Sequence, residues 1–80
     1  MVVAFVMVRI GPGEYLDWMR TVKERVAEVP EVTEVYSVFG RYDLIIKVEA
    51  ESIDGVGSIV DDKIRPIAGV VSTETFIAHA

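Results

Sequence analysis

The sequence predicts an α+β fold in which two helices cover one face of a four-stranded antiparallel sheet. Segments with a two-residue apolar period and segments with a helical period follow one another as strand, helix, strand, strand, helix, strand. The first and third strands are apolar on both faces, whereas the second and fourth are mixed, as expected for two central and two edge strands. This order is that of the ferredoxin-like βαββαβ sandwich.

The first strand, residues 2–10, carries apolar side chains on both faces and therefore needs cover on both. They are Val2, Ala4, Val6 and Val8 on one face, and Val3, Phe5 and Met7 on the other. A turn at Gly11-Pro12-Gly13 ends the strand. Residues 14–29 then form a helix that stops before Pro30, because the residue preceding a proline avoids the α region. One apolar stripe runs along this helix: Tyr15, Trp18, Met19, Val22, Val26 and Val29.

The second and third strands, residues 32–39 and 43–50, form a β-hairpin. Only Gly40-Arg41-Tyr42-Asp43 joins them, which predicts a tight reversal. Gly40 can adopt a positive φ, and Asp43 can accept hydrogen bonds from nearby backbone N–H groups.

Ser52 is a suitable N-cap for a second helix that reaches Arg65. Pro66 and Gly69 end this helix, whose apolar stripe consists of Ile53, Val56, Ile59, Val60 and Ile64. Residues 70–78 form the last strand. Its run Ser72-Thr73-Glu74-Thr75 is polar enough for the edge of a sheet, with the hydroxyls pointing outward.

Length and charge narrow the class of protein. The 80 residues allow one domain, spanning residues 1–80. The net charge of −5 and the lack of a Lys/Arg cluster argue against direct binding of nucleic acid. The apolar run of residues 2–8 is too short for a membrane span and lacks the features of a signal peptide. We therefore expect a cytoplasmic protein without a membrane partner. Asn, Gln and Cys are all absent, which favours a thermophilic source.

The apolar content exceeds what so small a core can hold. Hydrophobic residues make up 51% of the chain. If both helices lie on one face of the sheet, the other face exposes a larger apolar patch than monomers usually carry. A homodimer formed sheet to sheet, like a dimeric α/β barrel, would bury this face.

No catalytic or metal-binding set is evident. His79 is the only histidine and is expected on the surface. Asp61 and Asp62 are adjacent in a helix, so their side chains diverge by about 100° and should lie on a solvated face. One histidine and no cysteine exclude Ser/His/Asp and Cys/His arrangements. We expect no enzyme, no metal and no cofactor.

The hairpin tip allows two interpretations. In the simpler one it is a well-made turn, in which Asp43 binds backbone amides and Tyr42 covers a helix end. In the other it binds a zwitterion, because Arg41 or free backbone N–H groups suit a carboxylate and Asp43 suits an ammonium group. The residues alone leave both open.

Two stretches resemble the effector-binding (RAM) domain of Lrp/AsnC, or feast/famine, transcription regulators. Residues 30–50 contain Pro30-Glu31-Val32, then Gly40-Arg41-Tyr42-Asp43, then an apolar strand. Residues 64–77 contain a helix end, Gly69-Val70 and a Thr-rich strand. The family's Pro-Gly-Val turns are replaced by Pro30-Glu31-Val32 and Ala68-Gly69-Val70. The DNA-binding helix-turn-helix that normally precedes this domain is missing, so the chain resembles the stand-alone form.

The resemblance implies a dimer that assembles further into tetramers, octamers or larger rings. It also implies that small effectors, often amino acids, bind between dimers near the hairpin. Carried over by position, Gly40, Arg41, Tyr42 and Asp43 form the ligand-binding loop, with Thr73 and Thr75 as further candidates on the last strand. The expected function is non-catalytic amino-acid sensing, coupled to assembly and to co-assembly with full-length Lrp/AsnC regulators. The alternatives are a small enzyme of the dimeric α/β-barrel type and an ACT-like regulatory domain.

Overall fold

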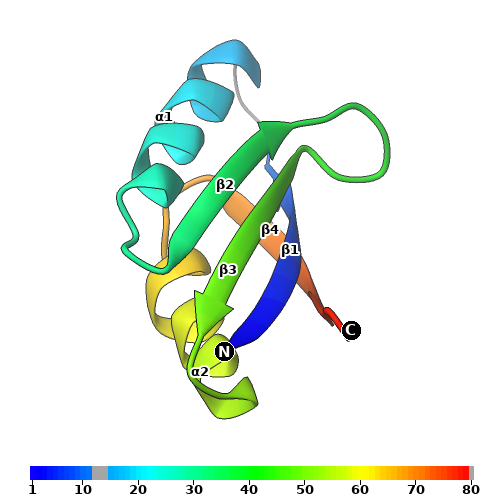
Figure 1. The fold of residues 1–80 in the computed structure, drawn as a ribbon. Coiled ribbons are helices and arrows are strands. Elements are labelled where there is room, and N and C mark those ends of the chain that lie inside the picture. Colours follow the sequence, from blue (N-terminus) through cyan, green and yellow to red (C-terminus); the bar gives the residue numbers. More distant parts are fainter. Residues whose placement is uncertain (12–14, 80) are drawn as a thin grey trace.

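The computed structural model describes residues 1–11 and 15–79 (Figure 1). The predicted order of elements is confirmed. The elements are β1 (Val2–Ile10), α1 (Tyr15–Ala27), β2 (Val32–Ser37), β3 (Leu44–Ala50), α2 (Ile53–Ile59), the π-helical segment η1 (Val60–Ile64) and β4 (Val70–Ile77). The predicted turn at Pro12 and Gly13 and the predicted helix start at Glu14 lie outside the described residues, as does the side chain of Tyr15.

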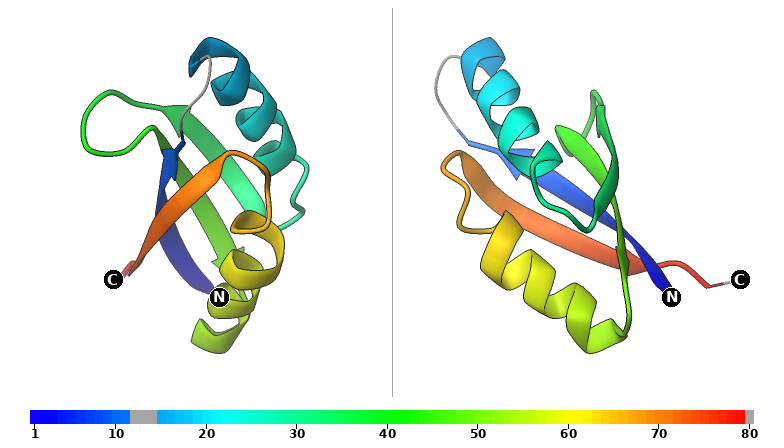
Figure 2. Two further views of the ribbon diagram at one scale, coloured as in Figure 1. Left: turned by 180° about the vertical axis from the view of Figure 1, so that it is seen from behind. Right: turned by 60° about the vertical axis from the view of Figure 1, so that its left-hand side comes forward.

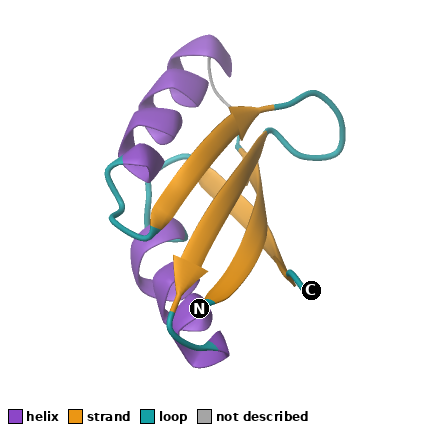
Figure 3. Cartoon of the chain, in the orientation of Figure 1, coloured by secondary structure: helices purple, strands orange, loops and turns teal. Residues whose placement is uncertain are grey.

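The strands form one antiparallel sheet in the order β2-β3-β1-β4, so β1 and β3 are central as predicted. Both helices lie on the same side of this sheet (Figures 2 and 3). In the register, Val6 lies opposite Ile46 on β3 and Thr75 on β4. These pairs fix which side chains of all three strands share a face, because successive residues of a strand alternate.

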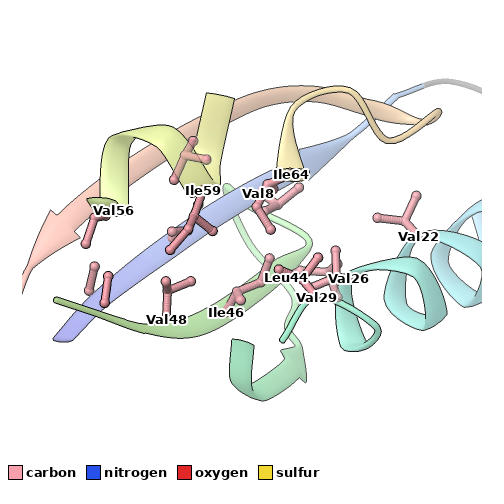
Figure 4. Close-up of a cluster of buried hydrophobic side chains, with 14 of the residues drawn as sticks. Val8, Val22, Val26, Val29, Leu44, Ile46, Val48, Val56, Ile59 and Ile64 are labelled. Atoms are coloured by element: carbon pink, nitrogen blue, oxygen red, sulfur yellow. The ribbon is translucent and has the colours of Figure 1, made fainter. Parts of the chain in front are cut away.

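The core lies between the sheet and the helices (Figure 4). Ala4, Val6 and Val8 point into it from β1 and are fully buried. They meet apolar side chains of β3 and of both helices, namely Leu44, Ile46, Val48, Val22, Val26, Val56, Ile59 and Ile64. The predicted alternation along β1 is therefore confirmed. The helical stripes are confirmed too, except that Ile53 is 63% exposed and that the side chain of Tyr15 lies outside the described residues.

The other face of the sheet carries the second apolar set of β1. Val3, Phe5 and Met7 are half-buried there, and Phe76 of β4 lies opposite Phe5 with 48% of its surface exposed. Ile45 of β3 lies opposite Met7 on the same face. No described helix covers these side chains (Figure 2). We call this the open face.

Element ends differ from the prediction by one or two residues. Helix α1 ends at Ala27, because the N–H groups of Glu28 and Val29 donate to carbonyls only three residues back, at 3.2 and 3.1 Å. This tightened turn precedes Pro30. Strand β2 ends at Ser37 and β3 begins at Leu44, which leaves a longer hairpin loop than expected.

The second helix is capped as predicted but changes its winding. The N–H of Gly55 donates to Oγ of Ser52 at 3.0 Å. From Val60 onward the chain is π-helical, and the N–H of Arg65 donates to the Val60 carbonyl, five residues back, at 2.9 Å. Pro66 follows directly, and its ring would crowd the carbonyl four residues earlier in regular α geometry. A wider turn relieves this crowding.

The link between η1 and β4 runs close against α1. Gly69 adopts a φ of 102°, a region that favours glycine. A Cβ atom at this position would lie 2.7 Å from Cε3 of Trp18 and 2.9 Å from Cγ2 of Val22. The carbonyl of Gly69 accepts the N–H of Gly11 at 2.8 Å, which ties the start of β4 to the end of β1.

Candidate functional site

The hairpin loop comprises residues 38–43, six residues rather than the predicted tight reversal. It projects beyond the ends of β2 and β3 (Figure 1). The N–H of Val38 donates to the carbonyl of Asp43 at 3.0 Å and closes its base. Gly40 has a φ of 145°, yet a Cβ there would meet no atom within 4 Å. Glycine is therefore favoured by backbone conformation, as predicted, and not by lack of space.

Asp43 fastens the loop to the end of β1. Its Oδ2 accepts the N–H of Ile10 at 2.8 Å, and its own N–H donates to the carbonyl of Val8 at 2.9 Å. The prediction that Asp43 binds a backbone amide is confirmed, but the amide belongs to β1 and not to the turn. Part of the Asp43 carboxylate is therefore committed to the fold, which limits what it can offer a ligand.

Tyr42 reaches across to β4 and does not cover a helix end. Its hydroxyl donates to Oε1 of Glu74 at 2.8 Å. Arg9 lies beside it, with Cζ 5.9 Å from the centre of the Tyr42 ring. The guanidinium of Arg9 also donates from Nη2 to the carbonyl of Arg41 at 2.8 Å. Three separate elements thus place a cation, a phenol and a carboxylate together, and we call Arg9, Tyr42 and Glu74 the cluster.

The hydrogen bond to Glu74 and the surroundings of the cluster keep the Tyr42 hydroxyl protonated. The pKa of its hydroxyl is raised, first because it donates a hydrogen bond to the Glu74 carboxylate, then through desolvation and the negative charge of Glu74. The positive charges of Arg41 and Arg9 act in the opposite direction. Since the ordinary pKa of tyrosine is about 10, Tyr42 stays protonated at neutral pH.

Sequence reasoning missed Arg9 and Glu74. The register places Glu74 opposite Met7 on the open face, and Arg9 belongs to the same face because it lies two residues beyond Met7. A signal was present: Arg9 is the only charged residue in β1, and Glu74 is the only one in β4. A lone charge in an otherwise uncharged strand needs a partner or solvent.

The two predicted threonines lie on the other face of the sheet. Thr73 and Thr75 are opposite Val8 and Val6, whose side chains point toward the helices. They line a groove of about 370 Å³ between β4 and the second helix, together with Val60, Asp61 and Arg65. The sheet therefore separates them from the cluster. The predicted residues Gly40, Arg41, Tyr42 and Asp43 form one group, and Thr73 and Thr75 form another.

Other polar features are explained by the fold. Asp61 pairs with Arg65 one helical turn later, at 3.4 Å, and both are exposed. His79 is exposed near the end of the described chain. Within residues 1–11 and 15–79, no group of three or more His, Cys, Asp or Glu side chains could hold a metal ion. No helix in that part of the chain is long and apolar enough to span a bilayer.

Comparison with known sequences points to one family. The model of the Lrp/AsnC ligand binding domain matches residues 3–79. An uncharacterised HTH-type transcriptional regulator of Pyrococcus abyssi is 41% identical over 75 residues, which are 94% of this chain and 49% of the regulator. The regulatory protein AsnC of Escherichia coli K12 is 40% identical over 53 residues, 66% of this chain and 35% of AsnC. The chain thus spans about half the length, or less, of these curated relatives.

Solved structures confirm the predicted fold. A protein from Thermus thermophilus superposes with a TM-score of 0.88 at 35% identity, covering 100% of this chain and 95% of that one. Escherichia coli AsnC gives 0.86 at 30% identity, over 96% of this chain and 50% of AsnC. A transcriptional regulator from Neisseria meningitidis, solved as a complex with L-Met, gives 0.86 at 18% identity over 99% of this chain and 50% of that one. At that identity the likeness concerns the fold alone.

Proposed function

Because the chain belongs to the Lrp/AsnC ligand-binding domain family, we propose that it binds an amino acid or a similar small effector at the hairpin loop. Membership of this family identifies the chain as an effector-sensing module related to transcription regulators. It also decides against the ACT-like alternative. We further propose that residues 1–80 act as one domain without catalytic activity, because the relatives are named as regulators.

The observation that carries this proposal is the cluster beside the loop. Arg9 uses one guanidinium nitrogen for the Arg41 carbonyl, and Glu74 uses one carboxylate oxygen for Tyr42. Among the described residues, the remaining donors of Arg9 and acceptors of Glu74 have no hydrogen-bond partner, and both side chains are exposed. Opposite charges held on two neighbouring strands suit a zwitterion. The α-carboxylate would bind Arg9 or the exposed Arg41, and the α-ammonium would bind Glu74.

This assignment revises the roles expected from sequence. The zwitterion interpretation of the sequence paired Asp43 with the ammonium group, but one oxygen of the Asp43 carboxylate accepts the Ile10 N–H. In the proposed site Glu74 binds the ammonium group instead. The pairing of β4 with β1 fixes the position of Glu74 beside Tyr42. Gly40 and Asp43 shape the loop, while Arg41 and Tyr42 present side chains. Thr73 and Thr75 remain candidates for a separate contact in the groove behind β4.

We expect Arg41→Ala and Glu74→Gln each to weaken effector binding by roughly ten- to a hundredfold. Each removes one charge-assisted hydrogen bond, typically worth about 1.5–3 kcal/mol. Glu74→Gln preserves the shape of the side chain and keeps an oxygen that can accept the Tyr42 hydroxyl, so the loop should stay in place. Calorimetric titration with the twenty amino acids first identifies the best effector, and the same titration then compares the variants.

Arg25→Ala is the matched control, since it removes an exposed arginine from α1, on the side of the sheet opposite the open face (Figure 2). It should leave the affinity unchanged, and the melting temperatures of all effector-free variants should lie close together. Unchanged affinity in both Arg41→Ala and Glu74→Gln would place the site elsewhere, with Thr73 and Thr75 next to be tested. If none of the twenty amino acids gave measurable binding, amino-acid sensing at this loop would be contradicted.

Assembly is the second part of the proposal. A second copy would bury Phe5, Met7 and Phe76 of the open face, so an effector bound to Arg9 and Glu74 would lie at the border of this interface. Further contacts would build tetramers, octamers or rings. We propose that effector binding changes this assembly and that the chain co-assembles with full-length Lrp/AsnC regulators in the cytoplasm. The lack of Asn, Gln and Cys supports a thermophilic source, and Pyrococcus and Thermus proteins are among its relatives.

The 80-residue chain itself is not expected to bind DNA at physiological salt. Its net charge is −5, and binding to the phosphate backbone requires several cations that release counterions. An electrophoretic mobility assay with pure protein checks this, with a full-length relative as positive control. A DNA shift by the 80-residue chain that weakens as salt rises would refute the prediction.

A further inference from the structure

Strand β4 forms one edge of the sheet, and no described strand lies beside its free side. An edge strand presents unpaired N–H and C=O groups to other chains, and proteins usually protect it with lysine, proline or a bulge. Residues 72–77 lack these protections, since their only charged side chain is Glu74 and their register with β1 is regular. The opposite edge differs, because β2 has a register shift between Val32 and Glu34, and Glu34 pairs with Lys47 at 3.2 Å. The β4 edge is therefore the more open to pairing.

The hydrogen bonds of β4 show which of its backbone groups face this edge. The N–H of Ala78 donates to the Val3 carbonyl of β1 at 2.8 Å. In an antiparallel strand the N–H and C=O groups of successive residues point to opposite sides. Every second residue back from Ala78 therefore also faces β1. The residues between them direct these groups to the free edge: Thr73, Thr75 and Ile77.

Exposed apolar side chains lie along the same edge. Ile77 is 40% exposed at the end of β4, and Ile53 is 63% exposed at the start of α2. Both line the groove of about 370 Å³ between β4 and the second helix, together with Val60. Apolar side chains gathered on a surface mark an interaction site more often than scattered single ones do. A strand added beside β4 would cover this groove.

We propose that β4 of a second copy pairs antiparallel with this edge, about a two-fold axis that passes beside Thr75. The outward-facing residues then form hydrogen-bonded pairs. Thr75 pairs with Thr75 of the second copy, and Thr73 of each copy pairs with Ile77 of the other. Each Ile77 side chain therefore lies beside Thr73 at the far end of the other copy's groove.

Other positions of the axis are less favourable. An axis beside Glu74 would set two carboxylates directly opposite each other, and like charges in that position destabilise a strand pair. An axis beside Thr73 would draw in the start of β4, where the register shift between Arg9 and Ile10 interrupts the ladder. With the axis beside Thr75, each Glu74 lies opposite Phe76 of the other copy, and only the regular part of β4 is used.

The charges of the second helix agree with this arrangement. Helix α2 runs alongside β4 in the opposite direction (Figure 2). The antiparallel pairing therefore brings Arg65, which lines one end of the groove, toward the first turn of α2 in the other copy, which carries Asp54. The contact is self-complementary, so it closes after two copies.

This inference deepens the assembly part of the proposed function, because it names the contact that joins face-to-face dimers into tetramers. A face-to-face dimer whose two-fold axis runs across the strands carries both β4 edges on one side. Two such dimers then join through two edges at once, so a contact that is weak by itself suffices.

The chain contains no cysteine, so one introduced cysteine tests the register directly. Thr75→Cys is expected to form a covalent dimer on mild oxidation, because the Cα atoms of such a pair are about 5.5 Å apart, within the range of disulfides. Thr73→Cys should remain largely uncrosslinked, since the two copies of that residue lie roughly 14 Å apart along the strands. Absence of the Thr75→Cys crosslink, or equal crosslinking of both variants, would overturn the proposal.

A second measurement tests the role of the edge in assembly. Thr75→Lys sets two ammonium groups opposite each other in every edge pair, so it should raise the dimer–tetramer dissociation constant at least tenfold in sedimentation equilibrium. Thr33→Lys makes the same change at an exposed position of β2 and should leave the constant unchanged. Circular dichroism checks that both variants fold. A wild-type oligomer that Thr75→Lys does not weaken would overturn this inference but leave the face-to-face dimer intact. A monomeric wild type at micromolar concentration would overturn both.

Discussion

Replacing Met7 with lysine is expected to convert the proposed face-to-face dimer into a monomer. Met7 lies on the open face between Ile45 of β3 and Glu74 of β4. In a face-to-face dimer each copy would bury one new ammonium group, and the penalty for burying a charge is several kcal/mol per ion. With two such groups in each dimer and about 1.4 kcal/mol for each factor of ten, the dissociation constant should rise at least a thousandfold.

The variant should still fold, because the open face is solvated in the monomer and Glu74 offers a counter-charge. Light scattering over a concentration series measures the oligomeric state, and circular dichroism checks the fold. Thr21→Lys adds the same charge at an exposed position of α1 and should leave the dimer unchanged. A Met7→Lys variant that stays dimeric would mean that the copies associate through another surface, such as the edge of β4.

The fold was predictable because its main determinants are local. The two-faced apolar pattern of β1 and β3 requires a central position in the sheet, and the mixed patterns of β2 and β4 allow an edge. Ser52 and Pro30 mark helix ends by chemistry that a sequence displays directly. The π-helical winding after Val60 was not predictable, since it depends on how the chain relieves the crowding at Pro66 while keeping Val60 and Ile64 in the core.

The candidate site was only half predictable. Gly40, Arg41, Tyr42 and Asp43 are contiguous, so their combined chemistry is visible in the sequence. Arg9 and Glu74 join them only through the pairing of β1 with β4, and 32 residues separate Tyr42 from Glu74. A single sequence does not specify strand register, so it could not show that Glu74 faces the loop while Thr73 and Thr75 face the helices. The β1 amide bound by Asp43 was hidden for the same reason.

Gly69→Ala is expected to destabilise the chain by roughly 2–5 kcal/mol. Two costs combine. The φ of 102° is strained for any residue with a side chain, and the new Cβ would lie 2.7 Å from the ring of Trp18 and 2.9 Å from Val22. Trp18 packs against the core and Val22 is fully buried within it, so neither can move aside cheaply. Urea denaturation at fixed protein concentration measures the change.

Gly57→Ala is the informative control, because the same methyl group should have the opposite effect there. Gly57 lies on the exposed side of α2, its Cβ would meet nothing within 4 Å, and alanine stabilises a helix by up to about 1 kcal/mol relative to glycine. One substitution should therefore lower the urea midpoint and the other should raise it. If Gly69→Ala were as stable as the wild type, the close contact between the start of β4 and Trp18 would be wrong, and with it the way the last strand is anchored to α1.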